Sequence, residues 1–315
     1  MHTRAVILEG PERLALRTLE LNPVGVDDVL VEIAWSGIST GTEKLLWSGA
    51  MPDFPGMGYP LVPGYESVGR IVDAGANMRA RLGEWVFVPG SNAFNGARGL
   101  FGGTASRVVL PSVRALAVPE KLGSDGVLCA LAATALHAIN GGTPPDLIIG
   151  HGVLGRLLAR LTIASGAPAP TVWEQSDGRR MALDGSDLNY TVTTAENDPR
   201  TDYSSIYDAS GDAGLFDTLI GRLAKGGEVV LAGFYSERIN FAFAPAFMKE
   251  ARLRVAAEWQ PDDLAQMHTM LRDGLLNLSG LISDHSPAER ASEAYPKAFS
   301  NPDCLKMVLD WSGTE

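Results

Sequence analysis

A glycine motif at residues 150–155 carries the strongest chemical signal in the sequence. Gly150, Gly152 and Gly155 follow the apolar run at residues 147–149 and open a stretch with helical character at residues 153–163. In such a strand, turn and helix unit, the first glycine permits the turn, the second permits close approach of a pyrophosphate, and the third permits packing of the helix on the sheet. We therefore predict a dinucleotide-binding turn.

The residues around this motif indicate how a nucleotide would be held. Its phosphates are expected at the helix N-terminus, near the free amides of Val153 and Leu154. Glu174 lies 19 residues after Gly155, behind a second apolar run. A carboxylate there accepts hydrogen bonds from the adenosine ribose and repels a 2′-phosphate, which favours NAD. The nearby residues 179–180, both arginine, leave NADP open.

The elements that must position these residues fall into two patterns. Up to about residue 118, short apolar runs are broken by Gly, Pro, Asn or Asp, which is typical of an irregular β-barrel. Residues 119–259 alternate short strands with helices, which indicates a doubly wound parallel sheet of the Rossmann type. The tail, residues 260–315, leaves this alternation and is assigned to the first domain. The predicted fold class is therefore α/β.

Several segments outside the glycine motif resemble the medium-chain dehydrogenases/reductases. Residues 63–75, PGYESVGRIVDAG, resemble that family's GHExxGxVxxxG motif. Residues 83–86, 102–106 and 37–39 resemble its GDRV turn, GGxAE segment and GxC loop, in the family's order. The resemblance implies a GroES-like catalytic domain beside the Rossmann domain, an NAD-dependent enzyme acting on a CH–OH group, and a homodimer joined through the edge of the nucleotide sheet.

The sequence departs from the zinc-dependent members of that family. Their catalytic zinc ligands are matched here by Ser39, Tyr65 and Ala130, whose hydroxyl and methyl groups are not the thiolate, imidazole or carboxylate donors of usual zinc sites. Cys129 neighbours Ala130, but successive helix residues point about 100° apart, so we expect it to be a buried small hydrophobe. The chain has 2 cysteines and cannot form a four-cysteine zinc lobe. No metal site is predicted.

Without zinc, other side chains must receive the proton when a carbinol is oxidised. The hydroxyl and ionisable side chains at the former metal positions are Ser39, Thr40, Thr42, Glu43, Lys44, Tyr65 and Glu66. Tyr65 is the favoured acid or base, with Lys44 or Glu66 altering its pKa and Ser39 and Thr42 as a relay. Two alternatives stay open: Tyr65 fills the space left by zinc, and Glu66 is structural.

An apolar segment before Pro60 favours a wide, flat ligand. Its large side chains, with two more from the following glycine-rich stretch, are Trp47, Met51, Phe54, Met57, Tyr59, Phe94 and Phe101. Interspersed glycines and prolines predict a loop, and aromatic and Met side chains form adaptable binding surfaces. The alternative is that they close one end of the barrel.

Two finer resemblances concern the helix and the substrate. Residues 134–138 are similar to the TAxHA segment of zinc-free members, which implies Thr134 at the cofactor and His137 near the nicotinamide and substrate, unless His137 is only packed in its helix. Residues 39–43 and 63–69, with His151, resemble a zinc-free branch that uses NAD to oxidise the C3 1-hydroxyethyl group of a bacteriochlorophyllide, a planar tetrapyrrole, in bacteriochlorophyll biosynthesis. A zinc-free NAD(P)H-dependent quinone or enoyl reductase, and a non-catalytic dinucleotide-binding regulator, stay open.

The composition excludes several partner classes. The 315 residues include 26 Lys and Arg against 37 Asp and Glu, and a net charge of −11 repels nucleic acid. No signal peptide and no apolar run of about 18 residues is present. We therefore expect a cytoplasmic protein with no membrane span, and the resemblance adds a location at the periphery of photosynthetic membranes.

Overall fold

The computed structural model describes residues 1–52, 55–181 and 188–314, and the chain divides into two compact units. Unit 1 comprises Met1–Ala130 and Ile282–Glu315, and unit 2 comprises Leu131–Leu281. The two boundaries between the units therefore lie later in the chain than the domain boundaries predicted at residues 118 and 260.

Local packing explains the later boundaries. The 3-10 segment Glu120–Leu128 packs on β3 (Asp28–Ile38) and β4 (Ser67–Ala74), which keeps it in unit 1. Helix α6 (Pro261–Arg272) belongs to unit 2, because its Asp263 hydrogen-bonds at 2.8 Å with His137 of α2 (Cys129–Asn140).

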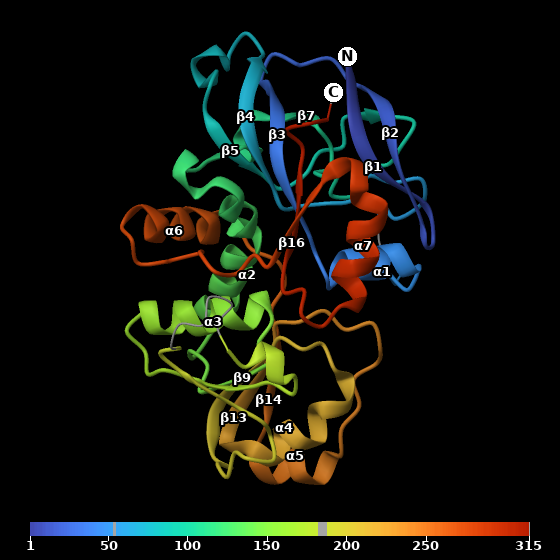
Figure 1. Ribbon diagram of the computed structural model, residues 1–315. Helices are drawn as coiled ribbons and strands as arrows, with labels where there is room; N and C mark the ends of the chain where they lie inside the picture. Colours follow the sequence, from blue (N-terminus) through green and yellow to red (C-terminus); the bar gives the residue numbers. More distant parts are fainter. Residues whose placement is uncertain (53–54, 182–187, 315) are drawn as a thin grey trace. The chain divides into compact units, whose positions relative to one another are not determined.

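Unit 1 is built on two sheets (Figure 1). Among the described residues, the small sheet has the order β1-β2-β6, and the large sheet has the order β15-β16-β3-β4-β5-β8, with β7 also paired to β3. The bounds are β1 His2–Gly10, β2 Arg13–Leu21, β5 Trp85–Val88, β6 Phe94–Asn95, β7 Arg107–Pro111, β8 Leu116–Ala117, β15 Asp284–Pro287 and β16 Met307–Asp310. Met307 pairs with Ile38 in antiparallel register, so the C-terminal strand returns beside the end of β3.

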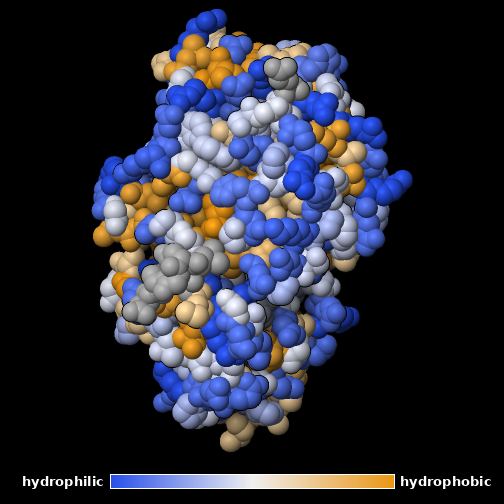
Figure 2. Space-filling view, viewed as in Figure 1, coloured by the Kyte–Doolittle hydropathy of each residue, from blue (hydrophilic) through white to orange (hydrophobic). Residues whose placement is uncertain are grey.

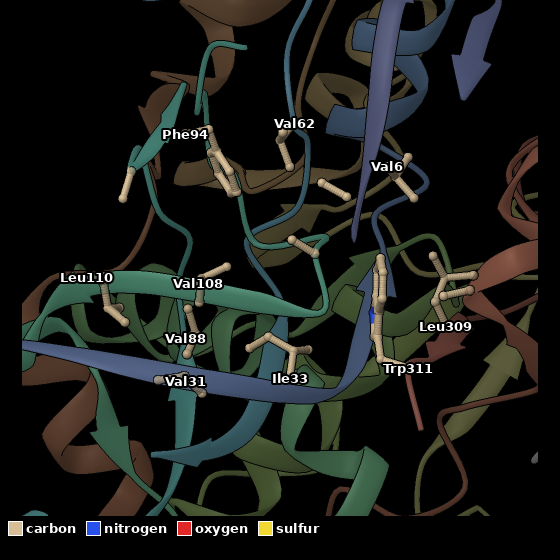
Figure 3. Packing of buried hydrophobic residues seen from close by; sticks show 14 of the residues in the cluster. Val6, Val31, Ile33, Val62, Val88, Phe94, Val108, Leu110, Leu309 and Trp311 are labelled. Atoms are coloured by element: carbon tan, nitrogen blue, oxygen red, sulfur yellow. The ribbon is translucent and has the colours of Figure 1, made fainter. Parts of the chain in front are cut away.

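Alternating side chains of these strands form the core of unit 1 (Figure 3). Strand β3 contributes Val31 and Ile33, and the C-terminal segment contributes Leu309 and Trp311. Phe94 is also buried in this core, with 7% of its surface exposed. The structure therefore does not place Phe94 on the ligand-facing wall predicted for it, because its neighbours on both sheets enclose the ring.

Two short helices complete the part of unit 1 that matters for chemistry. Helix α1 (Thr42–Ser48) follows β3 directly, and α7 (Ala291–Ser300) precedes β16. Helix α7 was not predicted from the sequence, since Pro296 inside it is a strong helix breaker. Burial of one face, including Tyr295, compensates for that local preference.

Unit 2 holds a parallel sheet with the order β11-β10-β9-β12-β13-β14. Its strands are β9 Leu147–Ile149, β10 Thr171–Trp173, β11 Thr191–Thr193, β12 Tyr203–Asp208, β13 Leu223–Leu231 and β14 Arg252–Val255. Helices α3 (Val153–Ala164), α4 (Phe216–Arg222) and α5 (Phe243–Lys249) accompany the strands in Figure 1. The chain leaves β9 toward β10 on one side and later returns to β12 on the other. Ligands of such sheets bind outside the carboxyl ends of the strands at this reversal.

The helical stretch Glu120–Asn140 is long and apolar enough to meet the criteria for a membrane span, but 61% of its apolar window is buried inside the fold. Gly123 has φ 53°, which breaks the stretch into two helices. Figure 2 shows hydrophilic residues over most of the visible face and hydrophobic ones in separate patches. The burial of its apolar window identifies the stretch as part of the core of the fold.

Candidate functional site

The glycine turn of unit 2 has the geometry that each of its glycines was predicted to provide. Gly150 has φ 91°, a conformation that favours glycine. A Cβ on Gly155 would lie 1.9 Å from the Gly150 carbonyl oxygen, so only glycine lets α3 pack this closely. A Cβ on Gly152 would meet no atom within 4 Å. The fold itself therefore requires two of the glycines, and the open space at Gly152 is where a ligand can approach the backbone.

The helix after this turn suits an anion. Gly152 is the N-cap of α3, and no side chain caps the helix. The amides of Val153 and Leu154 in the first turn point out of the helix end, where the dipole favours negative charge. The residues present therefore fit the pyrophosphate of a dinucleotide.

Glu174 lies beside this turn at the end of β10. Its Oε2 accepts a hydrogen bond from the His151 amide at 3.0 Å, and its Oε1 accepts one from the Ser176 amide at 2.8 Å. These bonds hold the carboxylate against the turn, within reach of a nucleotide placed there. Arg180 donates to the Glu174 and Gln175 carbonyl oxygens at 3.0 Å each and pairs with the Asp177 carboxylate at 2.8 Å, so its side chain already has partners within the protein.

A buried polar network behind the turn was missed by sequence analysis. His151 Nδ1 lies 2.5 Å from the Arg179 carbonyl oxygen, and its Nε2 lies 2.8 Å from the Tyr190 hydroxyl. Burial, and then the nearby Arg156, lower the pKa of His151 to about 4. The imidazole is therefore neutral, with Nδ1 donating to the carbonyl and Nε2 accepting from Tyr190.

Arg156 extends this network from the first turn of α3. It donates to the His151 carbonyl at 3.0 Å, and to those of Arg179 and Met181 at 2.9 and 2.7 Å. These bonds fasten the segment after Glu174 to the glycine turn. The signal in the sequence for this network was the presence of His151 and Arg156 beside the glycines of the turn, where small or apolar residues would suffice.

Helix α2 carries the two residues assigned by the TAxHA resemblance. His137 is held by Asp263, and the next residue, Ala138, accepts a hydrogen bond from Tyr207 at 3.1 Å. Because α2 leads into the amino end of β9, His137 lies toward the sheet edge opposite the glycine turn. The structure therefore favours the alternative of a packed histidine over a place near the nicotinamide. Thr134, also on α2, is partly exposed.

In unit 1 the structure brings together Tyr65, Ser39 and Thr42. The Tyr65 hydroxyl lies 2.6 Å from Ser39 Oγ and 3.5 Å from Thr42 Oγ1. Burial, and then the charge of Glu66, raise the pKa of Tyr65 well above its usual value. Tyr65 therefore keeps its proton and acts as a neutral hydroxyl. Lys44 is exposed on α1, where solvent screens its charge, so its predicted influence on Tyr65 finds no support.

A buried ion pair lies behind the hydroxyl groups. Glu66 is 0% exposed and pairs with Lys306, which is 2% exposed and comes from the segment before β16. Lys306 Nζ also donates to the Ile38 carbonyl oxygen at 3.1 Å. A Cβ on Gly37 would lie 2.5 Å from Glu66 Oε2 and 3.0 Å from Lys306 Cε, so glycine makes room for the pair. This pairing supports the structural alternative for Glu66, and Lys306 was not predicted from the sequence.

A second buried carboxyl group, Glu43, occupies the first turn of α1. Its Oε1 accepts a hydrogen bond from the Ser39 amide at 3.0 Å, and its Oε2 accepts one from the Tyr295 hydroxyl at 2.8 Å. Glu43 is 0% exposed, and burial raises its pKa to about 7. A carboxyl group that changes charge near neutral pH therefore adjoins the Ser39 and Tyr65 pair.

The donor set of this site differs from that of a zinc centre. The described residues contain no group of three or more His, Cys, Asp or Glu placed to hold a metal ion. Cys129 is fully buried, and burial raises the pKa of its thiol to about 12, which disfavours the thiolate that ligates metals.

The apolar side chains predicted to face a substrate gather around a small cluster. Trp47, Met51, Met57, Tyr59 and Phe101 are partly buried and pack against Leu8, Leu46 and Leu61. This packing supports the alternative that they close one end of the barrel, while their exposed parts can still contact a ligand. The Phe101 ring lies 5.0 Å from that of Tyr65. Phe54 lies outside the described residues, and Trp47 belongs to α1 instead of the predicted loop.

Comparison with known proteins places this geometry in a family. Residues 25–120 match the alcohol dehydrogenase GroES-like domain. The chain is 56% identical over its full length, and over the full length of the relative, to 2-desacetyl-2-hydroxyethyl bacteriochlorophyllide A dehydrogenase of Cereibacter sphaeroides. The protein of that name from Rhodobacter capsulatus is 54% identical, with 99% of each chain covered.

A solved structure shows the same fold at low identity. Acetophenone reductase of Geotrichum candidum, solved in complex with NAD, aligns with a TM-score of 0.85 and 18% identity over 100% of this chain and 98% of its own. The predicted GroES-like and Rossmann fold class is thereby confirmed. Because the full-length relatives exceed half identity, the chain belongs to the family of 2-desacetyl-2-hydroxyethyl bacteriochlorophyllide A dehydrogenases, within the medium-chain dehydrogenases/reductases.

Proposed function

We propose that this protein is an NAD-dependent dehydrogenase that oxidises the C3 1-hydroxyethyl group of a bacteriochlorophyllide to the acetyl group, in bacteriochlorophyll biosynthesis. The full-length identity to two relatives named for this hydroxyethyl substrate carries the proposal. The glycine turn of unit 2 and the hydroxyl pair of unit 1 provide the chemical groups that the reaction requires.

The nucleotide side of the reaction rests on unit 2. NAD, when bound, supplies the acceptor for the hydride that leaves the carbinol carbon. The amides of Val153 and Leu154 at the start of α3 hold the pyrophosphate, and the open space at Gly152 lets it approach. Glu174, held by two backbone amides, accepts hydrogen bonds from the adenosine ribose. Its negative charge disfavours the 2′-phosphate of NADP.

The proton side rests on the hydroxyl groups of unit 1. A zinc ion would lower the pKa of a bound alcohol, but hydroxyl side chains at positions 39 and 65 do not provide the usual zinc donors. Because Tyr65 is neutral, it acts by accepting the carbinol proton on its oxygen as it donates its own proton to Ser39, 2.6 Å away. We propose this metal-independent transfer as the chemical step of unit 1.

The substrate surface is proposed on the apolar cluster next to Tyr65. Phe101 contacts the Tyr65 ring, and Met57 and Tyr59 are partly exposed in the same cluster. Flexible Met and flat aromatic side chains suit a planar macrocycle.

The decisive experiment combines a product assay with metal analysis. Purified protein is given NAD and a 3-(1-hydroxyethyl) bacteriochlorophyllide, and NADH formation is followed together with the shift of the pigment's absorption. We expect equimolar NADH and 3-acetyl product, with no loss of rate after treatment with a strong chelator. Reduction of quinones or enones by NADPH instead would identify a zinc-free reductase. Binding of NADH without turnover of any carbinol or carbonyl would identify a regulator.

Assembly and location are proposed on separate grounds. Strand β14 ends the parallel sheet, and nothing in the described ranges pairs with its outer edge. Apolar side chains exposed around it are Phe243, Phe247, Met248, Leu253 and Val255. An unprotected apolar edge of this kind favours pairing with a second copy, so we propose a homodimer, to be tested by light scattering of wild type and Val255→Lys. A location in the cytoplasm, at the periphery of photosynthetic membranes, follows from the proposed substrate and is testable by cell fractionation.

A further inference from the structure

Two buried carboxyl groups flank the hydroxyl pair of unit 1, and only one of them has a cationic partner. Glu66 is paired with Lys306, whereas Glu43 is bonded to the Ser39 amide and the Tyr295 hydroxyl. Both carboxylate side chains, Lys306 and Tyr295 have at most 2% of their surface exposed, and Ser39 has 5%. With both carboxyl groups ionised, the cluster carries one uncompensated negative charge in a region without solvent. Proton uptake by Glu43 removes that charge.

We propose that Glu43 is the group that holds the proton released by the substrate, received through Tyr65 and Ser39. The inference rests on the proposed function, because it assigns the end of the same proton path. The carbinol O–H bond breaks as its proton passes to the Tyr65 oxygen, and the Tyr65 proton passes to Ser39 Oγ. The Ser39 proton then passes to Glu43 Oε1. The two electrons leave with the hydride to NAD, so atoms and charges balance.

Two hydrogen bonds of Ser39 place it between Tyr65 and Glu43. Ser39 Oγ lies 2.6 Å from the Tyr65 hydroxyl, which is a hydrogen bond. The Ser39 amide donates to Glu43 Oε1 at 3.0 Å, so the same residue that contacts Tyr65 also adjoins the carboxylate. The last transfer requires rotation of Ser39 about χ1, which we propose turns Oγ from Tyr65 toward the Glu43 carboxylate.

The balance of charges around Glu43 suits a group that both takes up and releases a proton. Burial and the charge of Glu66 favour its neutral form, while the bonds from Ser39 and Tyr295 and the charge of Lys306 favour the carboxylate. These opposing effects leave its pKa at about 7. Tyr65, whose pKa is raised by burial, gives up one proton only as it accepts another, so it stays neutral. At neutral pH Glu43 can therefore both take up and release a proton.

The first test is a pH profile of kcat/KM for carbinol oxidation. Wild type is expected to lose about tenfold in kcat/KM for each pH unit below about 7. Glu43→Gln is expected to be slower above pH 7 and to lack this limb. Tyr295→Phe removes a donor to the carboxylate, so the limb should move to higher pH. Glu20→Gln, an exposed glutamate on β2, is the matched control and should retain the wild-type profile.

The second test needs no substrate. Infrared spectra in D2O are recorded between pH 5 and 9, where a protonated carboxyl group gives its own carbonyl band. We expect a band that disappears with a midpoint near pH 7 in wild type and that is missing in Glu43→Gln. An unchanged pH limb in Glu43→Gln, or the same infrared titration in both proteins, would overturn the inference. Absence of any bacteriochlorophyllide oxidation would refute the proposed function, and the infrared titration would still report on Glu43.

Discussion

The ion pair between Lys306 and Glu66 gives a prediction whose magnitude follows from burial. Replacement of Lys306 by Met keeps the volume of the side chain but removes its charge. Glu66, 0% exposed, would then have no cation, and neither of its carboxylate oxygens makes a hydrogen bond in the described part of the chain. Removal of one partner from a buried pair costs about 3–5 kcal/mol. For a unit of this size we expect the Tm of Lys306→Met to fall by about 6–20 °C.

The pH dependence of this loss checks its cause. A carboxylate left alone in a buried site takes up a proton instead of remaining charged, so the stability difference between Lys306→Met and wild type should shrink at low pH. Calorimetry at pH 5 and pH 8 measures both values. Adding Glu66→Gln to Lys306→Met removes the stranded charge and should recover most of the loss. A loss of less than about 1 kcal/mol, or no recovery in the double variant, would show that the pair is not a buried electrostatic unit.

Four further predictions concern single groups of the two sites. Tyr65→Phe should lower kcat about 10²-fold with little change in Tm, because it removes a proton path and no core volume; an unchanged kcat would reduce Tyr65 to a packing role. Gly155→Ala should destabilise unit 2, since its Cβ would lie 1.9 Å from a backbone oxygen. Gly152→Ala, whose Cβ would meet no atom within 4 Å, should fold normally and weaken NADH binding in a fluorescence titration. Equal effects of the two variants on stability would contradict the assigned roles. Glu174→Ala should raise the Kd for NAD and narrow the difference from NADP, and equal use of both by wild type would refute its assignment. The pKa of Glu43 is about 7 in the folded protein against 4.5 in the unfolded chain, so protonated Glu43 contributes its full stabilisation below pH 4.5. The free energy of unfolding should then fall by about 3 kcal/mol as the pH rises through 7. Chemical denaturation should show this pH dependence in wild type and not in Glu43→Gln.

The glycine turn could be predicted in detail from the sequence because its requirements are local. Positive φ at Gly150 and close packing at Gly155 are demands of a strand, a turn and a helix that are contiguous in the chain. The position of Glu174 followed as well, since parallel neighbouring strands end at the same edge of a sheet. Strand β9 has the predicted bounds for the same reason, and β10 ends directly before Glu174 as predicted: each is a short apolar run between turn residues.

Other expectations failed where burial depends on distant segments. Phe94 looked like part of a ligand wall because glycines surround it in sequence, but strands from two sheets enclose its ring. His137 matched a motif near the nicotinamide, yet a hydrogen bond to Asp263, 126 residues later, holds it toward the other edge of the sheet. Helix α7 went unpredicted because a proline lies inside it, and the burial that stabilises it is tertiary.

The sequence by itself determined that the chain carries a dinucleotide turn and that hydroxyl groups stand where related enzymes place zinc ligands, because residue type and spacing suffice for both statements. The tertiary structure alone decided which charges lie beside those hydroxyl groups. Tyr295 reaches Glu43 across 252 residues, and Lys306 reaches Glu66 only because β16 pairs with β3. Proton affinity in a buried site depends on desolvation and on neighbouring charges. Both are properties of the folded chain, and no local pattern in the sequence encodes them.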